Sequence, residues 1–444
     1  MKKQSLTQLI SQFNQPDTHL VISGYPEHGS NPKNHGIAWY TKLTLEPIAK
    51  KYNQKFVVLA ERGEQNEPQL FVKGNILVLR IFDSNRVHLY PQILKYLHKF
   101  SQINNVFVHS EFGVRGGIWH FGLVLPFLAL IRATGRQITF FSHNVIDNIE
   151  MLSGHLNIKK NSLQAKAVNL ALRMYYFSLA KVTQQVVVLD HHLAERLSRF
   201  IPQNHITVLP IPVEQHKKIS KRVAKTALKI PQDKKVLLFF GFVTWYKGAD
   251  WLIKTFDALS KKFPNTQLII AGGPSYSLAS KPHYKRYYKQ LEQIAKRNPQ
   301  IQIAGFVDEK EIQTYFAAAD LAIFPYRGLM GASGCFSHAL ANKTPFMVSK
   351  KMAGMLESHD IIQVMEQVQV GSDSLIFSHT QTGLQTVLNT LNKANSAKKL
   401  HAVTNAIAER RSIRKTAVIE FETLYKHTES DKKAGLPKLA FQNI

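Results

Sequence analysis

Two short segments place small residues and a cation where a predicted strand gives way to a predicted helix. The first is Trp-Tyr-Lys-Gly at 245–248, which follows the apolar run 237–240. The second is Gly-Ala-Ser-Gly at 331–334, which follows the apolar run 321–324. Backbone N–H groups at the start of a helix, together with the positive end of its dipole, bind anions. Two such turns at the carboxyl edge of one parallel sheet predict a bound nucleoside diphosphate.

Lys247 is the first candidate for catalysis in these turns. Departure of a nucleoside diphosphate builds negative charge on its β-phosphate, and a fixed cation there lowers the barrier. Gly241, Ser333 and Gly334 are further candidates for binding the donor phosphates, Ser333 and Gly334 through N–H groups at a helix N-terminus. The structural alternatives are a surface lysine in a turn and a plain helix-capping serine. The two roles of Ser333 are compatible.

Apolar runs of strand length alternate with helical patterns along the whole chain. Its 444 residues exceed what one hydrophobic core usually organises. Near-continuous apolar strands are typical of parallel sheets covered on both faces. The runs are 19–23, 56–60, 76–79, 106–109, 138–141 and 186–189, and then 236–240, 267–271, 301–304, 321–324 and 346–349. The sequence therefore predicts an α/β protein with two doubly wound parallel-sheet domains.

The boundary between the two domains is predicted in the segment 214–235. This segment contains eight basic residues, two acidic ones and few large apolar groups. We assign residues 1–213 to the first domain and 214–414 to the second, with 415–444 returning to the first. The return is predicted because apolar side chains share one face of a C-terminal helix. They are Ile413, Ala417, Val418, Phe421, Leu424 and Tyr425.

The chain is strongly basic. It has 57 Lys and Arg against 30 Asp and Glu, a formal net charge of +27 that is spread over both halves. Such a field attracts lipid head groups, nucleic acid or phosphorylated substrates, although it also serves general solubility. The stretch 283–289 mixes aromatic rings with cations, which suits a head-group interface. The stretch 173–177 has a similar mixture, but there we expect ordinary helix packing.

Neither a disulfide framework nor a metal site is expected. Cys335 is the sole cysteine, which excludes an intramolecular disulfide and a thiolate cluster. The spacing of His28, His35, His109 and His143 matches no metal signature. The most apolar stretch, at 122–131, is too short to span a bilayer. We expect a protein either free in the cytoplasm or peripheral on the inner face of the membrane.

Taken together, the motifs resemble the retaining glycosyltransferases of family 4, which have the GT-B architecture of two Rossmann-like domains facing a central cleft. The resemblance lies in the segments 34–41, 108–117, 141–144, 246–248, 271–274, 304–307 and 319–326. It implies transfer of a hexose from a nucleoside diphosphate sugar, such as a UDP- or GDP-sugar, to a saccharide or lipid-linked acceptor. The second domain would bind the donor and the first the acceptor. The resemblance implies neither a metal nor another cofactor.

Four residues of the first domain are candidates on this basis. Gly36 would allow the loop before it to approach the donor phosphates or the acceptor closely, although a tight turn is the alternative. His143 follows a predicted strand and would hydrogen-bond the transferred sugar, with a buried structural histidine as the alternative. His35 and Glu111 are candidates on the acceptor side. For Glu111 we favour a structural carboxylate bonded to backbone N–H groups.

The sequence departs from the family pattern at the donor site. The family usually has two glutamates separated by seven residues, and the corresponding positions hold Met330 and His338. Phe242 replaces the usual arginine after the first glycine. His338 can still hydrogen-bond a ribose hydroxyl, but methionine cannot replace an acid that contacts a sugar.

We expect a retaining mechanism in which the leaving phosphate takes the proton of the acceptor hydroxyl, so that no protein nucleophile is needed. Cell-surface polysaccharide or glycolipid synthesis would fit such an enzyme. One alternative is a catalytically degenerate homologue that binds nucleotide sugar or acts as a scaffold. A second alternative, a nucleic-acid-binding protein, lacks any recognisable reading module in the sequence.

Overall fold

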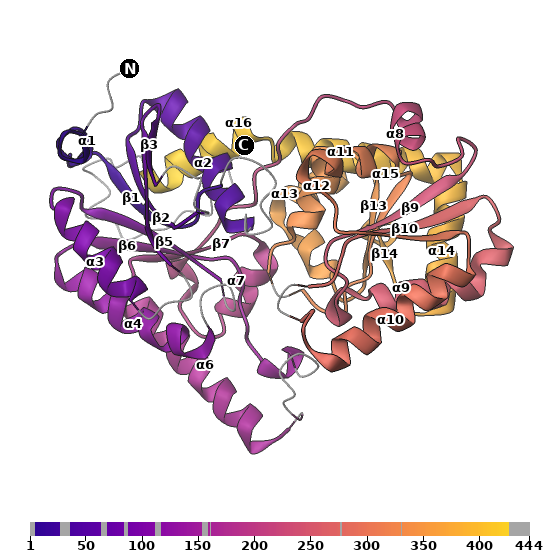
Figure 1. Cartoon of the computed structure of the whole chain (residues 1–444), viewed down its shortest axis with the longest axis horizontal. Helices are drawn as coiled ribbons and strands as arrows, with labels where there is room; N and C mark the ends of the chain where they lie inside the picture. The colour runs from indigo at the N-terminus through magenta and orange to yellow at the C-terminus, as the bar shows by residue number, and fades with distance from the viewer. Residues whose placement is uncertain are drawn as a thin grey trace. The chain divides into compact units, whose positions relative to one another are not determined.

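The structure is a computed structural model that describes residues 5–26, 36–63, 69–83, 88–111, 117–152, 159, 161–275, 278–329 and 331–425. The chain divides into two compact units (Figure 1). The first unit comprises Met1–Pro212, Met330–Ala332 and Ile413–Ile444. The second comprises Val213–Leu329 and Ser333–Ser412.

The first unit is built on an eight-stranded sheet in the order β3-β4-β2-β1-β5-β6-β7-β8. Only the pairing of β3 with β4 is antiparallel among these strands. The parallel strands follow the chain outward in both directions from β1, as in a doubly wound fold. The strands are β1 His19–Ile22, β2 Phe56–Glu61, β3 Leu70–Lys73, β4 Ile76–Phe82, β5 Asn105–Ser110, β6 Gln137–Ser142, β7 Gln185–Val188 and β8 Ile206–Val208.

Helices cover both faces of this sheet, because successive strand residues point to opposite faces. Val57 and Leu59 face one core, and Phe56 and Val58 face the other. The first core is covered by α1 Leu6–Phe13, α3 Leu89–Lys99, α4 Gly117–Ala133, α6 Leu163–Val182 and α7 His191–Leu197. The second is covered by α2 Gly36–Tyr52, α16 Ile413–Glu420 and a π-helical turn, Phe421–Tyr425.

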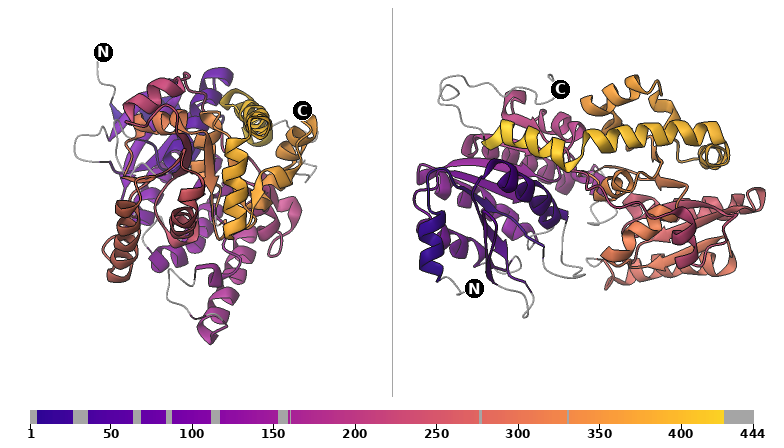
Figure 2. Two further views of the ribbon diagram at one scale, coloured as in Figure 1. Left: turned by 90° about the vertical axis from the view of Figure 1, so that its right-hand side faces the viewer. Right: turned by 90° about the horizontal axis from the view of Figure 1, so that it is seen from above.

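The C-terminal helix α16 packs against α2, within the first unit. Figure 2 shows the yellow C-terminal helix beside the indigo helix α2. Ala417, Leu424 and Tyr425 are buried there, and Phe421 stacks on Tyr52 with ring centroids 3.6 Å apart. The predicted docking of this helix on the first domain is confirmed.

The second unit contains a six-stranded, all-parallel sheet in the order β11-β10-β9-β12-β13-β14. Its strands are β9 Lys235–Phe240, β10 Thr266–Ala271, β11 Ile301–Gly305, β12 Leu321–Phe324, β13 Phe346–Ser349 and β14 Ile376–Phe377. Its helices are α8 Lys221–Ala227, α9 Ala249–Leu259, α10 Pro282–Arg297, α11 Glu309–Ala318, α12 Gly334–Ala341, α13 His359–Gln367, α14 Gln381–Asn392 and α15 Ala394–Arg410.

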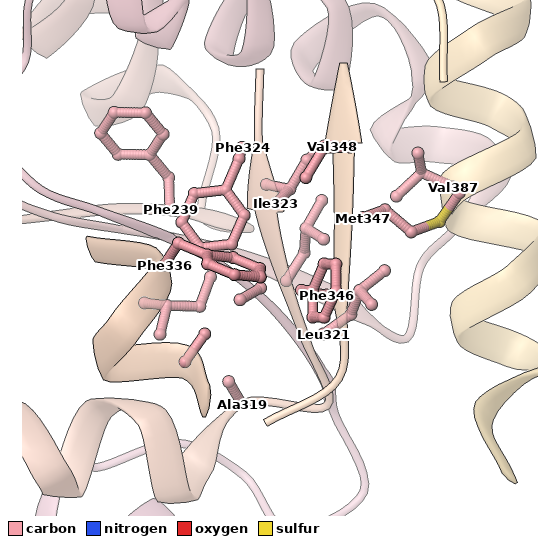
Figure 3. Packing of buried hydrophobic residues seen from close by; sticks show 14 of the residues in the cluster. Phe239, Ala319, Leu321, Ile323, Phe324, Phe336, Phe346, Met347, Val348 and Val387 are labelled. Atoms are coloured by element: carbon pink, nitrogen blue, oxygen red, sulfur yellow. The ribbon is translucent and has the colours of Figure 1, made fainter. Parts of the chain in front are cut away.

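Side chains from both faces of this sheet form the core of the second unit. Figure 3 shows Phe336 of α12 beside strands β12 and β13, while Val387 of α14 lies next to Met347 on their other side. The Phe336 ring meets Phe346 edge-on at 4.7 Å between centroids. This packing fixes α12 against the sheet and therefore the position of its N-terminus.

The α/β class with two parallel-sheet domains is confirmed by these two sheets. Strands β3, β8 and β14, which have two to four residues each, were absent from the sequence prediction. The expectation of ordinary packing at 173–177 is wrong in part. Tyr175 and Tyr176 are buried, but Met174 is 63% and Phe177 is 59% exposed.

A backbone hydrogen bond joins the segments where the chain passes between the units near Val213 and Ser412. The Val213 N–H donates to the carbonyl of Arg411 at 2.7 Å. The Arg411 guanidinium in turn binds the buried Asp360 carboxylate through Nε at 2.6 Å and Nη2 at 3.0 Å. Burial acts to raise the pKa of Asp360, but the Arg411 charge outweighs it and lowers that pKa.

Candidate functional site

The backbone turn after β9 strongly favours glycine at position 241. Gly241 has a φ of +117°, a backbone conformation that residues other than glycine rarely adopt. A Cβ atom on Gly241 would lie 2.7 Å from both the Lys247 Nζ and the Cys335 Sγ. The glycine therefore leaves the space that these two side chains occupy.

Two more glycines pack this turn closely against neighbouring strands. Gly248 has a φ of +75°, and a Cβ there would come within 1.8 Å of the Pro325 carbonyl oxygen. A Cβ on Gly272 would come within 1.9 Å of the Gly241 carbonyl oxygen. The end of β9 is thus held directly against the segments that follow β10 and β12.

Lys247 ends a short 3-10 turn, Trp245–Lys247, and its side chain is directed inward. Only 8% of Lys247 is exposed. Its Nζ lies 3.4 Å from the Cys335 Sγ and 5.6 Å from the centre of the Tyr326 ring. Burial acts to lower the pKa of Lys247, but attraction to Cys335, Tyr326 and Tyr246 raises it well above its ordinary value. A buried ammonium group is therefore charged at neutral pH.

Ser333 and Gly334 form the start of α12 beside this ammonium group. Ser333 is the N-cap, and its Oγ accepts a hydrogen bond from the Phe336 N–H at 3.3 Å. Gly334 is exposed, and no atom lies within 4 Å of the position of a Cβ there. Because Cys335 is in the first turn of α12, its contact with Lys247 brings both predicted phosphate-binding turns together. The helix N-terminus and the ammonium group make one electropositive corner.

An ion pair clamps the lysine-bearing turn to the segment after β12. The Arg327 guanidinium binds both carboxylate oxygens of Asp250, at 2.7 and 2.8 Å. The Arg327 guanidinium also lies over the Trp245 ring at 4.7 Å, and the backbone N–H of Arg327 donates to the Tyr246 carbonyl at 2.7 Å. A bidentate, stacked arginine of this kind fixes geometry as well as adding attraction.

His338 follows Gly334 by one turn of α12. Its ring lies against Phe240 and Phe316, with centroids at 5.6 and 6.2 Å. Burial, with a smaller effect from His216, lowers the pKa of His338 to about 4. The imidazole is therefore neutral at physiological pH, able to donate one hydrogen bond and accept another.

In the first unit, His143 is hydrogen-bonded to a second histidine. His143 follows β6, and its Nε2 lies 3.1 Å from the Nδ1 of His109 on β5. Both histidines are buried, and the His109 ring stacks on Phe141 at 4.1 Å. The Tyr40 ring meets His143 edge-on at 5.2 Å. These contacts fix the plane of the His143 ring.

A buried carboxyl group is hydrogen-bonded to Tyr40. The Tyr40 hydroxyl donates to Glu420 Oε2 at 3.5 Å, and the Tyr425 hydroxyl donates to Oε1 at 3.4 Å. Burial raises the pKa of Glu420 to about 8, although both hydroxyl groups act to lower it. The C-terminal segment thus reaches the same tyrosine that contacts His143.

The remaining first-domain candidates have fewer described contacts. Glu111 follows β5, is half-buried, and has a pKa raised to about 7 by burial. Gly36 is the first residue of α2, and no atom lies within 4 Å of the position of a Cβ there. Gly24 has a clearer steric role, since a Cβ there would lie 3.1 Å from the Ala38 Cβ. His35 lies outside the described residues, as do His28 and Met330.

Sequence reasoning missed several residues of these two clusters. Cys335 carried no signal, because its contact with Lys247 spans 88 positions in the chain. Tyr326 ended a recognised motif without an assigned role, and Arg327 directly follows that motif. Glu420 was assigned no role in the sequence analysis, although its side chain is only 3% exposed.

The described part of the chain lacks two features, a metal-ligand cluster and a membrane-spanning helix. It contains no group of three or more His, Cys, Asp or Glu side chains placed to hold a metal ion. No helix in the described ranges has the length and apolar character needed to cross a bilayer.

Comparison with known sequences identifies similarity in the part of the second unit that holds the electropositive corner. Residues 234–369 match the family described as Glycosyl transferases group 1. The chain is also 26% identical over 314 residues to YtcC of Bacillus subtilis (strain 168), whose name carries a provisional assignment as a glycosyltransferase. That match covers 65% of this chain and 71% of YtcC.

The fold is similar to solved structures over nearly the whole chain. Sucrose-phosphate synthase from Thermosynechococcus elongatus matches with a TM-score of 0.66 at 14% identity, over 91% of this chain and 97% of that one. An E. coli trehalose-6-phosphate protein bound with UDP-2-fluoro glucose matches with a TM-score of 0.62 at 13% identity, over 93% of this chain and 99% of that one. Anabaena HepE in complex with UDP and glucose matches with a TM-score of 0.62 at 15% identity, over 92% of this chain and 99% of that one.

These comparisons confirm the predicted GT-B fold. The family match and the YtcC relative support the coarser prediction that the chain is a glycosyltransferase. The finer assignment to family 4 stays a prediction, because the structural neighbours share only the fold at these identities.

Proposed function

We propose that this protein is a retaining glycosyltransferase that moves a hexose from a UDP- or GDP-sugar to a saccharide or lipid-linked acceptor. The pathway that best fits its basic charge is synthesis of a cell-surface polysaccharide or a glycolipid. No metal or other cofactor takes part in the proposed reaction.

The observation that carries the proposal is the contact between Lys247 and the first turn of α12. A buried ammonium group 3.4 Å from the Cys335 Sγ stands beside the exposed start of a helix at Gly334. A pyrophosphate placed there would receive the lysine charge on one side and backbone N–H groups on the other. This arrangement supports a nucleoside diphosphate as the leaving group.

The choice of donor is supported by what related folds bind. The Anabaena HepE structure contains UDP and glucose, and the E. coli structure contains UDP-2-fluoro glucose. His338, a neutral imidazole one turn after the corner, would hydrogen-bond a ribose in this proposal. We therefore favour a UDP-sugar over a GDP-sugar as the first donor to test.

In the proposed reaction the bond between the anomeric carbon and the β-phosphate oxygen breaks as the acceptor hydroxyl attacks from the same side. The leaving phosphate takes the hydroxyl proton, and Lys247 stabilises the charge that remains. His143, oriented by His109, would hydrogen-bond the sugar, and Glu111 the acceptor hydroxyl. A carboxyl with a pKa of about 7 is present in both protonation states at neutral pH, which suits that contact.

A second candidate is a nucleotide-sugar binder that does not catalyse transfer. It is favoured by Met330 and His338, which occupy the positions of the two family glutamates. Such a protein would bind the nucleotide at the same corner and would show no turnover.

The test is a thermal-shift screen of UDP-, GDP- and ADP-sugars, because a tight ligand raises the melting temperature by mass action. Lys247→Ala should abolish the shift for intact donors, since loss of a charge-assisted contact lowers affinity roughly 10- to 100-fold. Lys254→Ala, an exposed lysine on α9, is the matched control and should keep the shift.

A donor hydrolysis and transfer assay then separates the two candidates. Binding with turnover supports the transferase, and binding without turnover supports the nucleotide-sugar binder. An unchanged shift in Lys247→Ala would remove Lys247 from the donor site, and RNA binding without nucleotide affinity would refute both candidates.

A further inference from the structure

Two neighbouring helices of the first unit, α4 and α6, have outward faces on the same side of the sheet. They lie side by side and contact each other (Figure 1). Both helices bury their inner sides in one core. Phe127 and Ile131 of α4 and Tyr176 and Leu179 of α6 belong to that core. The sides of α4 and α6 that face away from this core are therefore both exposed to solvent, on the same side of the sheet.

The outward face of α6 is apolar along its length. Leu163 is 84% exposed, Leu170 59%, Met174 63% and Phe177 59%. Their spacing of seven, four and three residues places them in one stripe on the helix. A surface helix of a globular protein normally carries polar side chains on this face. Four large apolar side chains in one line form a surface suited to binding.

The neighbouring helix α4 also exposes large apolar side chains. Leu123 is 41% and Leu130 55% exposed, and Pro126 and Ala129 are exposed between them. We call the six large side chains Leu123, Leu130, Leu163, Leu170, Met174 and Phe177 the α4–α6 surface. Two packed helices thus expose apolar groups that neither core uses.

Basic side chains accompany the α4–α6 surface. Lys166, Arg173 and Lys181 of α6 and Arg132 of α4 are exposed, and neither helix contains an acidic residue. The Lys181 Nζ lies 5.3 Å from the centre of the Phe177 ring. An apolar stripe bordered by cations is complementary to a bilayer with anionic head groups.

We propose that the α4–α6 surface docks on an anionic lipid bilayer, with both helices parallel to the membrane plane. The apolar side chains enter the boundary between head groups and acyl chains, and the basic side chains bind anionic head groups. Helix α4 has 17 residues and helix α6 has 20, and α6 carries three cations along its length. Cations along a helix are costly inside a bilayer, so these helices fit an orientation parallel to the membrane plane. A second copy of this chain is a poorer occupant, because two basic faces repel each other.

This inference deepens the proposed function on its acceptor side, since a docked first unit would meet lipid-linked acceptors at the membrane surface. Only the access to lipid-linked acceptors rests on the proposed function. Docking itself is measurable without donor, acceptor or turnover.

The experiment is co-sedimentation of the full chain with vesicles of phosphatidylcholine, with and without phosphatidylglycerol. The wild-type protein should bind the anionic vesicles and bind the neutral ones more weakly. The apolar variant Leu170→Gln, Met174→Gln, Phe177→Gln should bind the anionic vesicles at least about tenfold more weakly. These positions are exposed, so glutamine leaves the helix and its core contacts in place.

Two further variants separate the surface from the overall charge. Lys166→Gln, Arg173→Gln, Lys181→Gln should also lower binding about tenfold or more, since each cation near anionic lipid contributes separately. The matched control removes three exposed lysines from α9 and the turn that follows it in the second unit, and it should bind as the wild type does. Its changes are Lys254→Gln, Lys261→Gln and Lys262→Gln.

A reporter variant tests insertion directly. Phe177→Trp should show a shift of its fluorescence to shorter wavelength when anionic vesicles are added. No shift together with wild-type sedimentation of the apolar variant would overturn the proposal. An equal loss in the three-lysine control of the second unit would also overturn it, because binding would then follow net charge alone.

Light scattering tests whether a second copy of this chain, and not a bilayer, covers the α4–α6 surface. A wild-type dimer that the apolar variant converts to a monomer, without vesicle binding, would assign the surface to self-association and refute docking. Donor thermal shifts on the same variants keep the two proposals apart. Normal donor shifts without vesicle binding refute docking alone, and vesicle binding without donor shifts refutes the transferase alone.

Discussion

Gly241 and Lys247 are so close that a Cβ on the glycine would lie 2.7 Å from the lysine Nζ. The same Cβ would lie 2.7 Å from the Cys335 Sγ, at a backbone φ of +117°. The glycine therefore sets the position of the ammonium group through the space it leaves empty. The charge at the corner depends on a residue that has no side chain.

Gly241→Ala should lower donor affinity roughly tenfold or more, because the lysine has to leave its position. Backbone strain should also lower the free energy of unfolding by about 1–3 kcal/mol. Isothermal titration with UDP and thermal unfolding measure the two effects. Gly371→Ala is the matched control, since no atom lies within 4 Å of a Cβ there. Wild-type UDP affinity in Gly241→Ala would show that the corner does not bind the donor.

Alkylation of Cys335 should block donor binding, because a group added to its Sγ would occupy the space beside the Lys247 Nζ. The thiol is the sole cysteine of the chain, so mass spectrometry reports the modification without ambiguity. Iodoacetamide treatment should remove the thermal shift with UDP, and UDP present beforehand should slow the reaction. Cys335→Ser treated in the same way should keep its shift. Full donor binding by the alkylated protein would place the pyrophosphate elsewhere.

Glu420 should make the protein less stable as the pH rises. Its folded pKa of about 8 lies above the ordinary carboxyl value, so the native state keeps a proton that the unfolded state releases. The free energy of unfolding therefore falls between the two pKa values, by at most about 1.4 kcal/mol per pH unit. Glu420→Gln should remove this slope and be the more stable protein at pH 8. Urea unfolding across this pH range measures it, with the exposed Glu422→Gln as control.

Arg411→Ala should destabilise the second unit by about 3–5 kcal/mol, because it leaves the Asp360 carboxylate buried without its cation. Arg414→Ala, at an exposed position three residues later, should cost little. The pH dependence has the opposite sign to that of Glu420. Since the folded pKa of Asp360 is lowered, its contribution is complete above the ordinary carboxyl pKa and is lost as the pH falls through the folded value. Equal melting temperatures for the two variants would contradict this account.

The sheets could be predicted because their strands are buried on both faces and read as continuous apolar runs. The run predicted at 236–240 is strand β9, found at Lys235–Phe240. Strand β3 escaped prediction because it is an exposed antiparallel edge with four residues. Local patterns determine the first kind of strand, whereas tertiary pairing determines the second.

The electropositive corner could be predicted only in part. Lys247 and Ser333 each follow a strand, which is visible in the sequence, but the contact with Cys335 depends on the backbone at Gly241. The exposed face of α6 was misjudged because Met174 and Phe177 are typical core residues by type. Their exposure follows from Tyr175 and Tyr176 filling the inner side of the same helix.

The helix that completes one face of the first unit comes from a distant part of the chain. Residues 413–425 cover the core beside α2, but some 200 residues of the second unit are synthesised before them. During translation, that face of the first sheet stays open to solvent until the later unit has left the ribosome. The nascent protein therefore has to remain soluble while Tyr40, Tyr52 and their neighbours lack their covering helix, and its first unit is the last to be finished.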